Sequence, residues 1–388
     1  MKIPFHRPIF SKKTIDDIDV VLSSGWVTTG EKTHSFEQNL SQYLNVKNVV
    51  AVNSCTAALH LGAIASGLKS NDLYIAPTYT FVSSVEIGEY IGATPLLADI
   101  DTQTMNLDLN HVEYYLKKYG KKIKTIIPVH FAGNPVKMNN LRSISSPYDC
   151  FILEDAAHAL EAVDDGNKIG DTYDSVAFSF YANKNITTGG EGGAITTNDS
   201  KLADRLRKLS LHGIDKSGWS RFKSGGKWSY DVSLLGYKYN LTDVASSIGI
   251  DQLNNTNRWL KRRSDIFDQY HNSFQSIEGI KLPPSANNLS KHAKHLYIIQ
   301  IIKENWTISR DNLIVKLKEL GIGTSVHYKP VHMHSFYQNK YGYRAEDFIE
   351  SKNLYESAIS IPIYPDLKNE EVLYIIESIN ELWAKYSI

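Results

Sequence analysis

The sequence has little cysteine and no excess of charge. Its 388 residues include two cysteines, Cys55 and Cys150, and both lie in segments that read as buried parts of a core. This argues against a disulfide framework, and a reducing compartment is expected. Lys plus Arg and Asp plus Glu each number 42, so the formal net charge is zero. Such a chain has no overall field that attracts nucleic acid or an anionic membrane, and neither is expected as a partner.

Long hydrophobic runs are also missing. No segment approaches the length of a membrane span, and residues 1–8 lack the apolar stretch of a signal peptide. We therefore expect a cytoplasmic protein. The length is enough for two domains, or for one large domain with a smaller appendage.

From residue 35 onward, short apolar runs alternate with segments of helical period. This alternation predicts an α/β protein with a mostly parallel sheet covered on both faces. Functional residues should then lie at the carboxyl ends of the strands. The predicted strands are Val49–Val52, Tyr74–Ala76, Pro95–Ala98, Ile123–Val129 and Cys150–Leu153.

A second, smaller α/β unit is expected towards the C-terminus, with strands at 296–302 and 324–328 and helices at 310–320, 346–357 and 370–383. A polar loop is predicted at 213–226 and an exposed connection at 284–290. We assign residues 1–34 to an N-terminal arm, 35–253 to a large domain and 254–388 to a small domain.

One lysine stands between an apolar run and a glycine-rich turn. Lys184 follows the run 176–180 and precedes the glycines of 189–193. In a partly apolar setting that disfavours its charged form, a lysine becomes nucleophilic enough to form a Schiff base. The glycines are not a nucleotide-phosphate loop, because no Gly-Lys-Ser/Thr follows and the next segment is strand-like. Most loop lysines are merely solvated, so this interpretation depends on neighbouring groups.

Three other predicted strand ends carry candidates, each with a structural alternative. Thr56 and Ala57 open a helix, where free N–H groups can hold a phosphate, although an ordinary Ser/Thr cap is the simpler interpretation. Phe81 could cover a planar ligand, or it could pack in the core. Asp155 leaves an apolar strand and would pair with a protonated pyridine nitrogen, or it could cap the next segment.

Histidines gather near the C-terminal unit, at 292, 295, 327, 332 and 334. Their spacing matches no closed zinc pattern, and the group next to Pro330 is more typical of a loop that contacts a substrate. No metal is expected.

A Schiff-base lysine, an aspartate for a ring nitrogen, an aromatic ring and a phosphate seat are together the requirements of pyridoxal phosphate. At this point the sequence resembles a known family, the DegT/DnrJ/EryC1/StrS nucleotide-sugar aminotransferases. The resemblance covers nearly the whole chain. Its motifs are residues 53–60, 77–81, 154–159, 179–193, 236–242 and 327–330.

The resemblance implies an aminotransferase of fold type I, with a large domain built on a seven-stranded mostly parallel sheet, a small C-terminal domain, and a homodimer with its sites at the interface. It assigns Lys184 to the Schiff base and to proton transfer, and Asp155 to the pyridine nitrogen. Phe81 would stack on the ring and His158 would lie by the ring hydroxyl. The remaining contacts are Thr56, Ala57 and Ser179 for the phosphate, and His327 and Tyr328 for the substrate.

Three departures from the family pattern stand out. His158 occupies a position where the family often has glutamine. Lys238 replaces an asparagine that reaches the partner subunit's cofactor phosphate, and a lysine would also suit a phosphate. A second glycine is present at 189–190. A family branch that dehydrates sugars has histidine in place of the lysine, so Lys184 argues against that activity.

The expected reaction moves an amino group from L-glutamate, which leaves as 2-oxoglutarate, to a nucleotide-linked keto-deoxysugar. Carbon C4 is favoured because the loop 327–330 with Tyr337 resembles members that act there, and C3 is the second candidate. The product would serve a surface polysaccharide or a glycan. The alternatives are a non-catalytic regulator that binds pyridoxal phosphate or a nucleotide sugar, and a cofactor-free lyase, which would leave Asp155 without a purpose.

Overall fold

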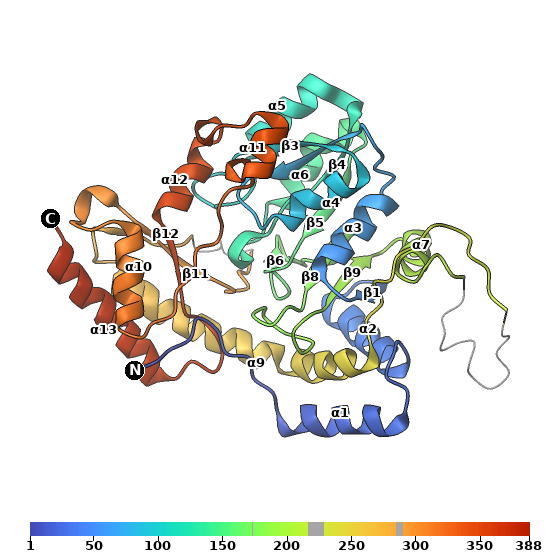
Figure 1. Cartoon of the computed structure of the whole chain (residues 1–388), viewed down its shortest axis with the longest axis horizontal. Helices are drawn as coiled ribbons and strands as arrows, with labels where there is room; N and C mark the ends of the chain where they lie inside the picture. Colours follow the sequence, from blue (N-terminus) through green and yellow to red (C-terminus); the bar gives the residue numbers. More distant parts are fainter. Residues whose placement is uncertain (173, 216–228, 285–289) are drawn as a thin grey trace.

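A seven-stranded sheet forms the centre of the molecule. The computed structural model describes residues 1–172, 174–215, 229–284 and 290–388. The strand order is β1-β9-β8-β5-β4-β2-β3 (Figure 1), and only β9 runs antiparallel to its neighbours. The mostly parallel sheet of the α/β prediction is thereby confirmed. The strands are β1 (Asn48–Val52), β2 (Leu73–Pro77), β3 (Thr94–Ala98), β4 (Ile123–Ile126), β5 (Phe151–Asp155), β8 (Ser175–Ser179) and β9 (Gly193–Thr197).

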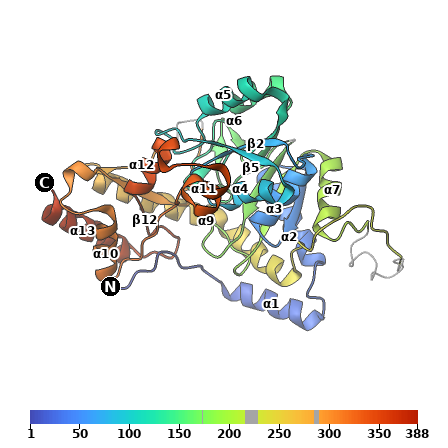
Figure 2. The ribbon, with the colours of Figure 1, turned by 45° about the horizontal axis from the view of Figure 1, so that its top comes forward.

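Helices cover both faces of this sheet, as Figure 2 shows from a second direction. Successive strand residues point to opposite faces, so Val50 and Ala177 join the core under one set of helices, while Val49 and Phe178 join the core under the other. Burial on both faces explains the continuous apolar runs. One set is α3 (Cys55–Ala65), α4 (Ser83–Ile91) and α7 (Ser200–Ser210), and the other is α2 (Glu31–Leu44), α5 (Leu109–Tyr119), α6 (Met138–Ser145) and the first part of α9 (Asp243–Phe274).

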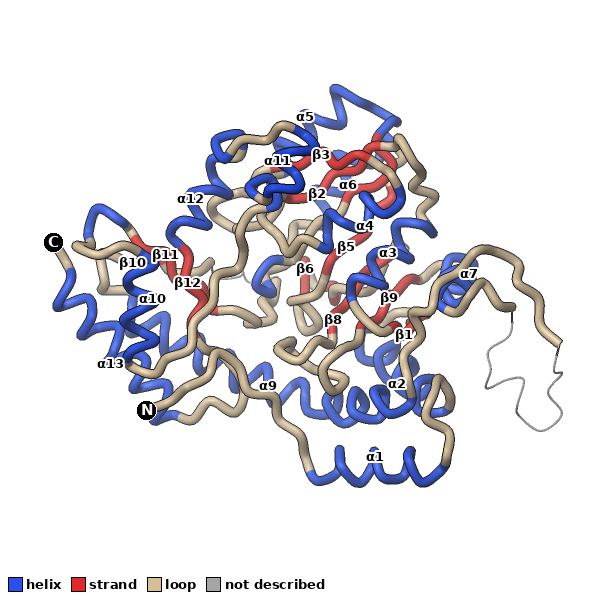
Figure 3. Tube along the Cα trace, viewed as in Figure 1, coloured by secondary structure: helices blue, strands red, loops and turns tan. Residues whose placement is uncertain are grey.

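A smaller unit lies at the other end of α9, where both chain termini are found (Figures 1 and 3). Its antiparallel sheet has the order β10-β11-β12 and packs with α10, α13 and the end of α9 around a separate core. The elements are β10 (Ile280–Lys281), β11 (Tyr297–Ile301), α10 (Arg310–Glu319), β12 (Ala358–Ile361) and α13 (Asn369–Tyr386). The connecting elements are the hairpin β6 (Val163–Asp164) and β7 (Asn167–Lys168), α11 (Ser335–Tyr341) and α12 (Ile349–Ser357).

The N-terminal segment joins the two units. Ile3 bridges to Ile322 and lies in the core of the small unit. Helix α1 (Lys12–Ser24) then packs along α9, where Asp251 accepts hydrogen bonds from Ser11 Oγ over 2.7 Å and from Thr14 Oγ1 over 2.6 Å. Helix α9 runs without a break through the expected boundary at residue 253, and the three domain ranges remain predictions.

Two predicted strands are corrected. The strand expected at 324–328 is absent, because only Ser325 pairs with β12, at Ser360, before the chain turns away. The strand expected to reach Val129 ends at Ile126, since Pro128 has no N–H to continue the ladder. The loop predicted at 213–226 and the connection at 284–290 lie mostly outside the described residues. Within the described ranges no helix is long and apolar enough to cross a membrane.

Candidate active site

A cavity of about 400 Å³ opens at the carboxyl ends of the parallel strands. It collects side chains from strand ends that are far apart in the sequence, as expected for an α/β sheet. Ala57 and Lys238 are not among its lining residues. The sequence-predicted residues that line it are Thr56, Phe81, Asp155, His158, Ser179, Lys184, His327 and Tyr328.

Lys184 lies in the loop that joins β8 to β9. The Lys184 N–H donates to the Tyr181 carbonyl over 2.9 Å, and the Ala182 N–H donates to the Gly190 carbonyl over 2.9 Å. The first bond closes a turn, and the second belongs to a parallel bridge between Tyr181 and Gly190 that holds the lysine loop against the glycine-rich turn. Burial lowers the pKa of Lys184 to about 8, and the nearby Cys55 and Asp155 act in the opposite direction. A pKa near 8 leaves about a tenth to a fifth of the amine neutral between pH 7 and 7.4, far more than for an ordinary lysine, which favours a nucleophilic role.

Asp155 is the last residue of β5 and is buried at the floor of the cavity. Its Oδ2 accepts a hydrogen bond from Ser84 Oγ over 2.6 Å, and its Oδ1 accepts from the Ala157 N–H over 3.0 Å. The Ala157 contact shows that Asp155 caps the turn that follows it, as the structural alternative expected, although no described helix begins at this point. A buried carboxylate requires a cationic partner, which a protonated ring nitrogen would supply.

The N-terminus of α3 faces the same cavity. Ser54 is its cap and accepts a hydrogen bond from the Ala57 N–H over 3.0 Å, so the cap alternative is correct and the Ala57 donor is already used. The first-turn N–H groups of Cys55 and Thr56 have no acceptor within the helix. Gly193 on β9 makes this arrangement possible, because a Cβ there would lie 2.5 Å from the Ser54 carbonyl carbon.

Aromatic and imidazole rings also line the cavity. Phe81 is 54% exposed, so its packing in the core is ruled out, and its ring centroid lies 5.7 Å from that of Tyr328. The buried aromatic of that segment is Tyr79, whose hydroxyl donates to the His327 carbonyl over 2.5 Å. His158 is buried, and its Nε2 lies 3.1 Å from the Tyr328 hydroxyl.

The histidines near Pro330 are held apart. His327 Nδ1 pairs with Ser360 Oγ at 2.8 Å, whereas His332 Nδ1 pairs with Thr78 Oγ1 at 2.7 Å. Burial lowers the pKa of His327 to about 3, with a smaller effect of Lys184 in the same direction. In the part of the chain that the structure describes, no group of three or more His, Cys, Asp or Glu side chains is placed to hold a metal ion.

Lys238 lies on the surface, where its Nζ contacts Asn240 Oδ1. This position keeps it out of the cavity of its own chain. The roles that the sequence assigns to Lys238 and Ala57 remain predictions.

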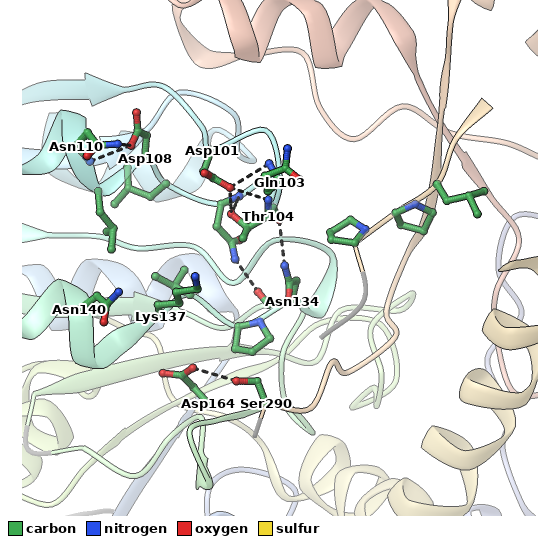
Figure 4. A pocket seen from close by; sticks show the side chains of 18 of the residues that line it. Asp101, Gln103, Thr104, Asp108, Asn110, Asn134, Lys137, Asn140, Asp164 and Ser290 are labelled. Atoms are coloured by element: carbon green, nitrogen blue, oxygen red, sulfur yellow. Dashed lines mark hydrogen bonds between the residues drawn. The ribbon is translucent and has the colours of Figure 1, made fainter. Parts of the chain in front are cut away.

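A larger cavity, of about 800 Å³, lies elsewhere and contains none of the sequence-predicted residues. Figure 4 shows that many of its polar groups bond to one another. Asp101 Oδ1 accepts from the N–H groups of Gln103 and Thr104, and Asn134 Nδ2 donates to the Thr104 carbonyl over 3.1 Å. These bonds stabilise the loop itself, so we do not regard this cavity as the active site.

Sequence reasoning missed the residues that orient the site. Ser84 and Ala132 carry no local signal, because they contact Asp155 and His158 only through the tertiary fold. Two other orienting residues did carry a sequence signal. Asn185 follows Lys184 directly, and His295 belongs to the histidines that were considered as metal ligands and not assigned.

The donor set fits pyridoxal phosphate. A lysine with a lowered pKa, a buried carboxylate, an exposed aromatic ring and the start of a helix line one cavity. These groups can hold, respectively, an aldehyde carbon, a ring nitrogen, a ring face and a phosphate.

Comparison with known proteins agrees with this geometry. The model of the DegT/DnrJ/EryC1/StrS aminotransferase family matches residues 8–380. The spore coat polysaccharide biosynthesis protein SpsC of Bacillus subtilis is 39% identical over 381 residues, which are 98% of this chain and 97% of SpsC.

Solved structures of two proteins are similar over almost the whole chain. Spr1654 of Streptococcus pneumoniae in its PMP form has a TM-score of 0.90 and 31% identity, with 99% of this chain and 100% of that chain covered. Its PLP form has a TM-score of 0.89 and covers 99% of each chain at the same identity. Helicobacter pylori PseC, an aminotransferase involved in the biosynthesis of pseudoaminic acid, has a TM-score of 0.89 and 25% identity, with 99% and 100% covered. The chain therefore belongs to the DegT/DnrJ/EryC1/StrS aminotransferase family, with fold type I and pyridoxal phosphate as its cofactor.

Proposed function

We propose that this protein transfers an amino group from L-glutamate to the keto carbon of a nucleotide-linked deoxysugar, at C4 in preference to C3. The observation that carries the proposal is the shared cavity of Lys184, with its lowered pKa, and Asp155. The names of two similar proteins support the proposal that the amino acceptor is a sugar. SpsC is named for polysaccharide biosynthesis, and PseC for the biosynthesis of pseudoaminic acid.

When bound, the cofactor supplies an aldehyde carbon that receives the amine and a ring that withdraws electrons from it. Lys184 carries the cofactor in the resting enzyme. Once displaced by the amino donor, Lys184 Nζ is the base that takes the proton from the donor's α carbon. Asp155 keeps the ring nitrogen protonated, because a buried carboxylate favours a cation beside it.

The other residues of the cavity bind and orient the cofactor and the sugar. Thr56, in the first turn of α3, and Ser179, the last residue of β8, hold the phosphate. Phe81 covers one ring face, and His158 lies at the ring oxygen. His327 and Tyr328 contact the sugar, and the glycan or surface polysaccharide is the destination of the product.

We further propose a homodimer in which Lys238 reaches the phosphate of the cofactor in the partner subunit. Its exposed position on this chain is compatible with that role. The partner would also close the open side of the cavity.

The test is a spectroscopic half-reaction. Protein loaded with pyridoxal phosphate should absorb visible light, lose that band when L-glutamate is added, and release an equivalent of 2-oxoglutarate. A panel of keto-deoxysugar nucleotides then identifies the acceptor and the aminated carbon. Lys184→Ala should abolish the visible band, while Lys201→Ala, an exposed lysine on α7, should leave it unchanged.

A regulator that binds cofactor without catalysis would give the visible band but no bleaching with any amino donor. A protein that stays colourless after addition of pyridoxal phosphate would contradict both functions.

A further inference from the structure

A buried chain of polar side chains runs from α9 to the cavity. Arg263 of α9 forms an ion pair with Glu161, and both side chains are buried. Glu161 Oε2 in turn accepts a hydrogen bond from Asn185 Nδ2, on the residue that follows Lys184. A carboxylate in an ion pair only accepts hydrogen bonds, so the Asn185 amide must turn its NH₂ group towards Glu161.

This orientation determines the tautomer of His295. Asn185 Oδ1 faces His295 Nδ1 at 2.7 Å, and an amide oxygen is only an acceptor. The proton of the His295 ring must therefore be on Nδ1. Burial keeps the pKa of His295 well below its usual value, and His158, Lys184, His327 and Arg263 add to the effect, so the ring is neutral and its Nε2 carries no proton.

The tautomer of His158 follows from an independent contact. The Ala132 N–H donates to His158 Nδ1 over 3.2 Å, which leaves the ring proton on Nε2. Burial, with Lys184 and His327 nearby, holds the pKa of His158 well below its usual value, so this ring is also neutral. His158 Nε2 then donates to the Tyr328 hydroxyl oxygen at 3.1 Å, and the Tyr328 proton remains available to a ligand in the cavity.

The two imidazoles pack against each other, with centroids 4.4 Å apart and planes inclined by 35°. His295 thus covers the face of His158, whose only other ring contacts are with Phe131 and Tyr328 among the described residues. The chain from Arg263 holds His295 in one orientation, and His295 limits rotation of His158 away from Ala132.

We propose that His295 is a positioning residue: it keeps His158 as a neutral Nε2–H donor to the Tyr328 hydroxyl oxygen, and thereby directs the Tyr328 O–H towards an anionic oxygen of the bound ligand. The assignment of that oxygen to the cofactor ring rests on the proposed function, whereas the tautomers do not. A structural role alone would affect folding but would leave the protonation behaviour of the cofactor unchanged.

The first experiment uses the cofactor-free protein labelled with ¹⁵N-histidine. Proton-bearing and proton-free ring nitrogens resonate at different ¹⁵N positions. We expect His158 to carry its proton on Nε2 and His295 on Nδ1 throughout the neutral pH range. A doubly protonated ring, or the opposite tautomer at either residue, would overturn the inference, and this measurement needs no variant.

The second experiment compares His295→Phe with His292→Phe. His292 is a matched control, because it is also buried, but its Nδ1 accepts from the Lys294 N–H, whereas His295 Nδ1 donates to Asn185 Oδ1. In His295→Phe loaded with pyridoxal phosphate, we expect the pH midpoint of the visible band to rise by about one unit, because donors to the ring oxygen favour the form that has lost its proton. His292→Phe should not move it.

His295→Asn is the rescue variant, since its amide can donate to Asn185 as Nδ1–H does, and it should restore about half of the shift or more. An unchanged midpoint in a folded His295→Phe protein would contradict the proposal. Loss of amine transfer with the expected tautomers would contradict only the proposed function.

Discussion

The Ser84 hydroxyl donates a hydrogen bond to Asp155 Oδ2 over 2.6 Å. Both side chains are buried, and they come from different elements, α4 and β5. With the Ala157 N–H on the other oxygen, the carboxylate is held from two sides. Its orientation towards the cavity is thus set before any ligand binds.

Ser84→Ala should therefore weaken the binding of pyridoxal phosphate. A hydrogen bond to a charged group contributes about 1.5 kcal/mol, so we expect roughly a tenfold rise in the dissociation constant. Fluorescence titration of the cofactor-free protein measures it. Ser351→Ala is the matched control, because Ser351 donates in the same way to the buried Asp99 far from the cavity. It should lower stability but leave the dissociation constant unchanged.

Lys184 should reduce the stability of the cofactor-free protein at neutral pH. Its pKa is lowered from 10.5 to about 8, so the folded state disfavours the charged form. This loss of stability is fully present below pH 8, where Lys184 is protonated in both the folded and the unfolded protein. It disappears as the pH rises towards 10.5, where Lys184 becomes neutral in both. Lys184→Met should raise the free energy of unfolding by about 2 kcal/mol at pH 7 and by much less near pH 10.

Urea unfolding of the cofactor-free proteins at the two pH values checks this. Lys201→Met replaces an exposed lysine and should show no such pH dependence. An equal gain for Lys184→Met at both pH values would show that packing, not charge, is responsible.

Sequence patterns predicted the features that depend on neighbouring residues in the chain. The sheet followed from apolar runs, and Lys184 and Asp155 followed from their places at strand ends. The difference between Tyr79 and Phe81 was not predictable, because both leave the same strand. Tyr79 is buried because its ring packs against Phe131 and its hydroxyl reaches the His327 carbonyl, 248 residues away in the sequence.

The same limit explains the wrong strand at 324–328. Its apolar residues read as a strand, but only Ser325 meets β12, and the next residues serve the cavity. Contacts such as Ser84 with Asp155 and Ala132 with His158 also depend on how distant elements pack.

Gly193→Ala should disrupt the phosphate seat. The new Cβ would lie 2.5 Å from the Ser54 carbonyl carbon and 2.7 Å from the Cys55 nitrogen, so the start of α3 must move. We expect a loss of cofactor affinity of about a hundredfold or more, since a shift of the helix start removes several phosphate contacts together. Ser54→Ala removes the cap alone and should cost about 1 kcal/mol of stability, with a smaller loss of affinity. Titration of both variants with pyridoxal phosphate distinguishes a displaced start of α3 from the loss of its cap alone.

The stability of the large sheet at its β1 edge should depend on the buried carboxylate of Glu37. Glu37 of α2 accepts from the Ala51 N–H over 2.9 Å and from Arg207 of α7 over 2.8 Å, while Arg207 also donates to the Val49 carbonyl over 2.7 Å. Arg207→Met removes the guanidinium from Glu37, and because the Arg207 side chain is 43% exposed, the free energy of unfolding should fall by about 1 to 2 kcal/mol. Lys261→Met breaks an exposed pair with Asp265 and should change it by less than about 0.5 kcal/mol. Similar losses in both variants would mean that Glu37 is held by the backbone of β1 rather than by Arg207.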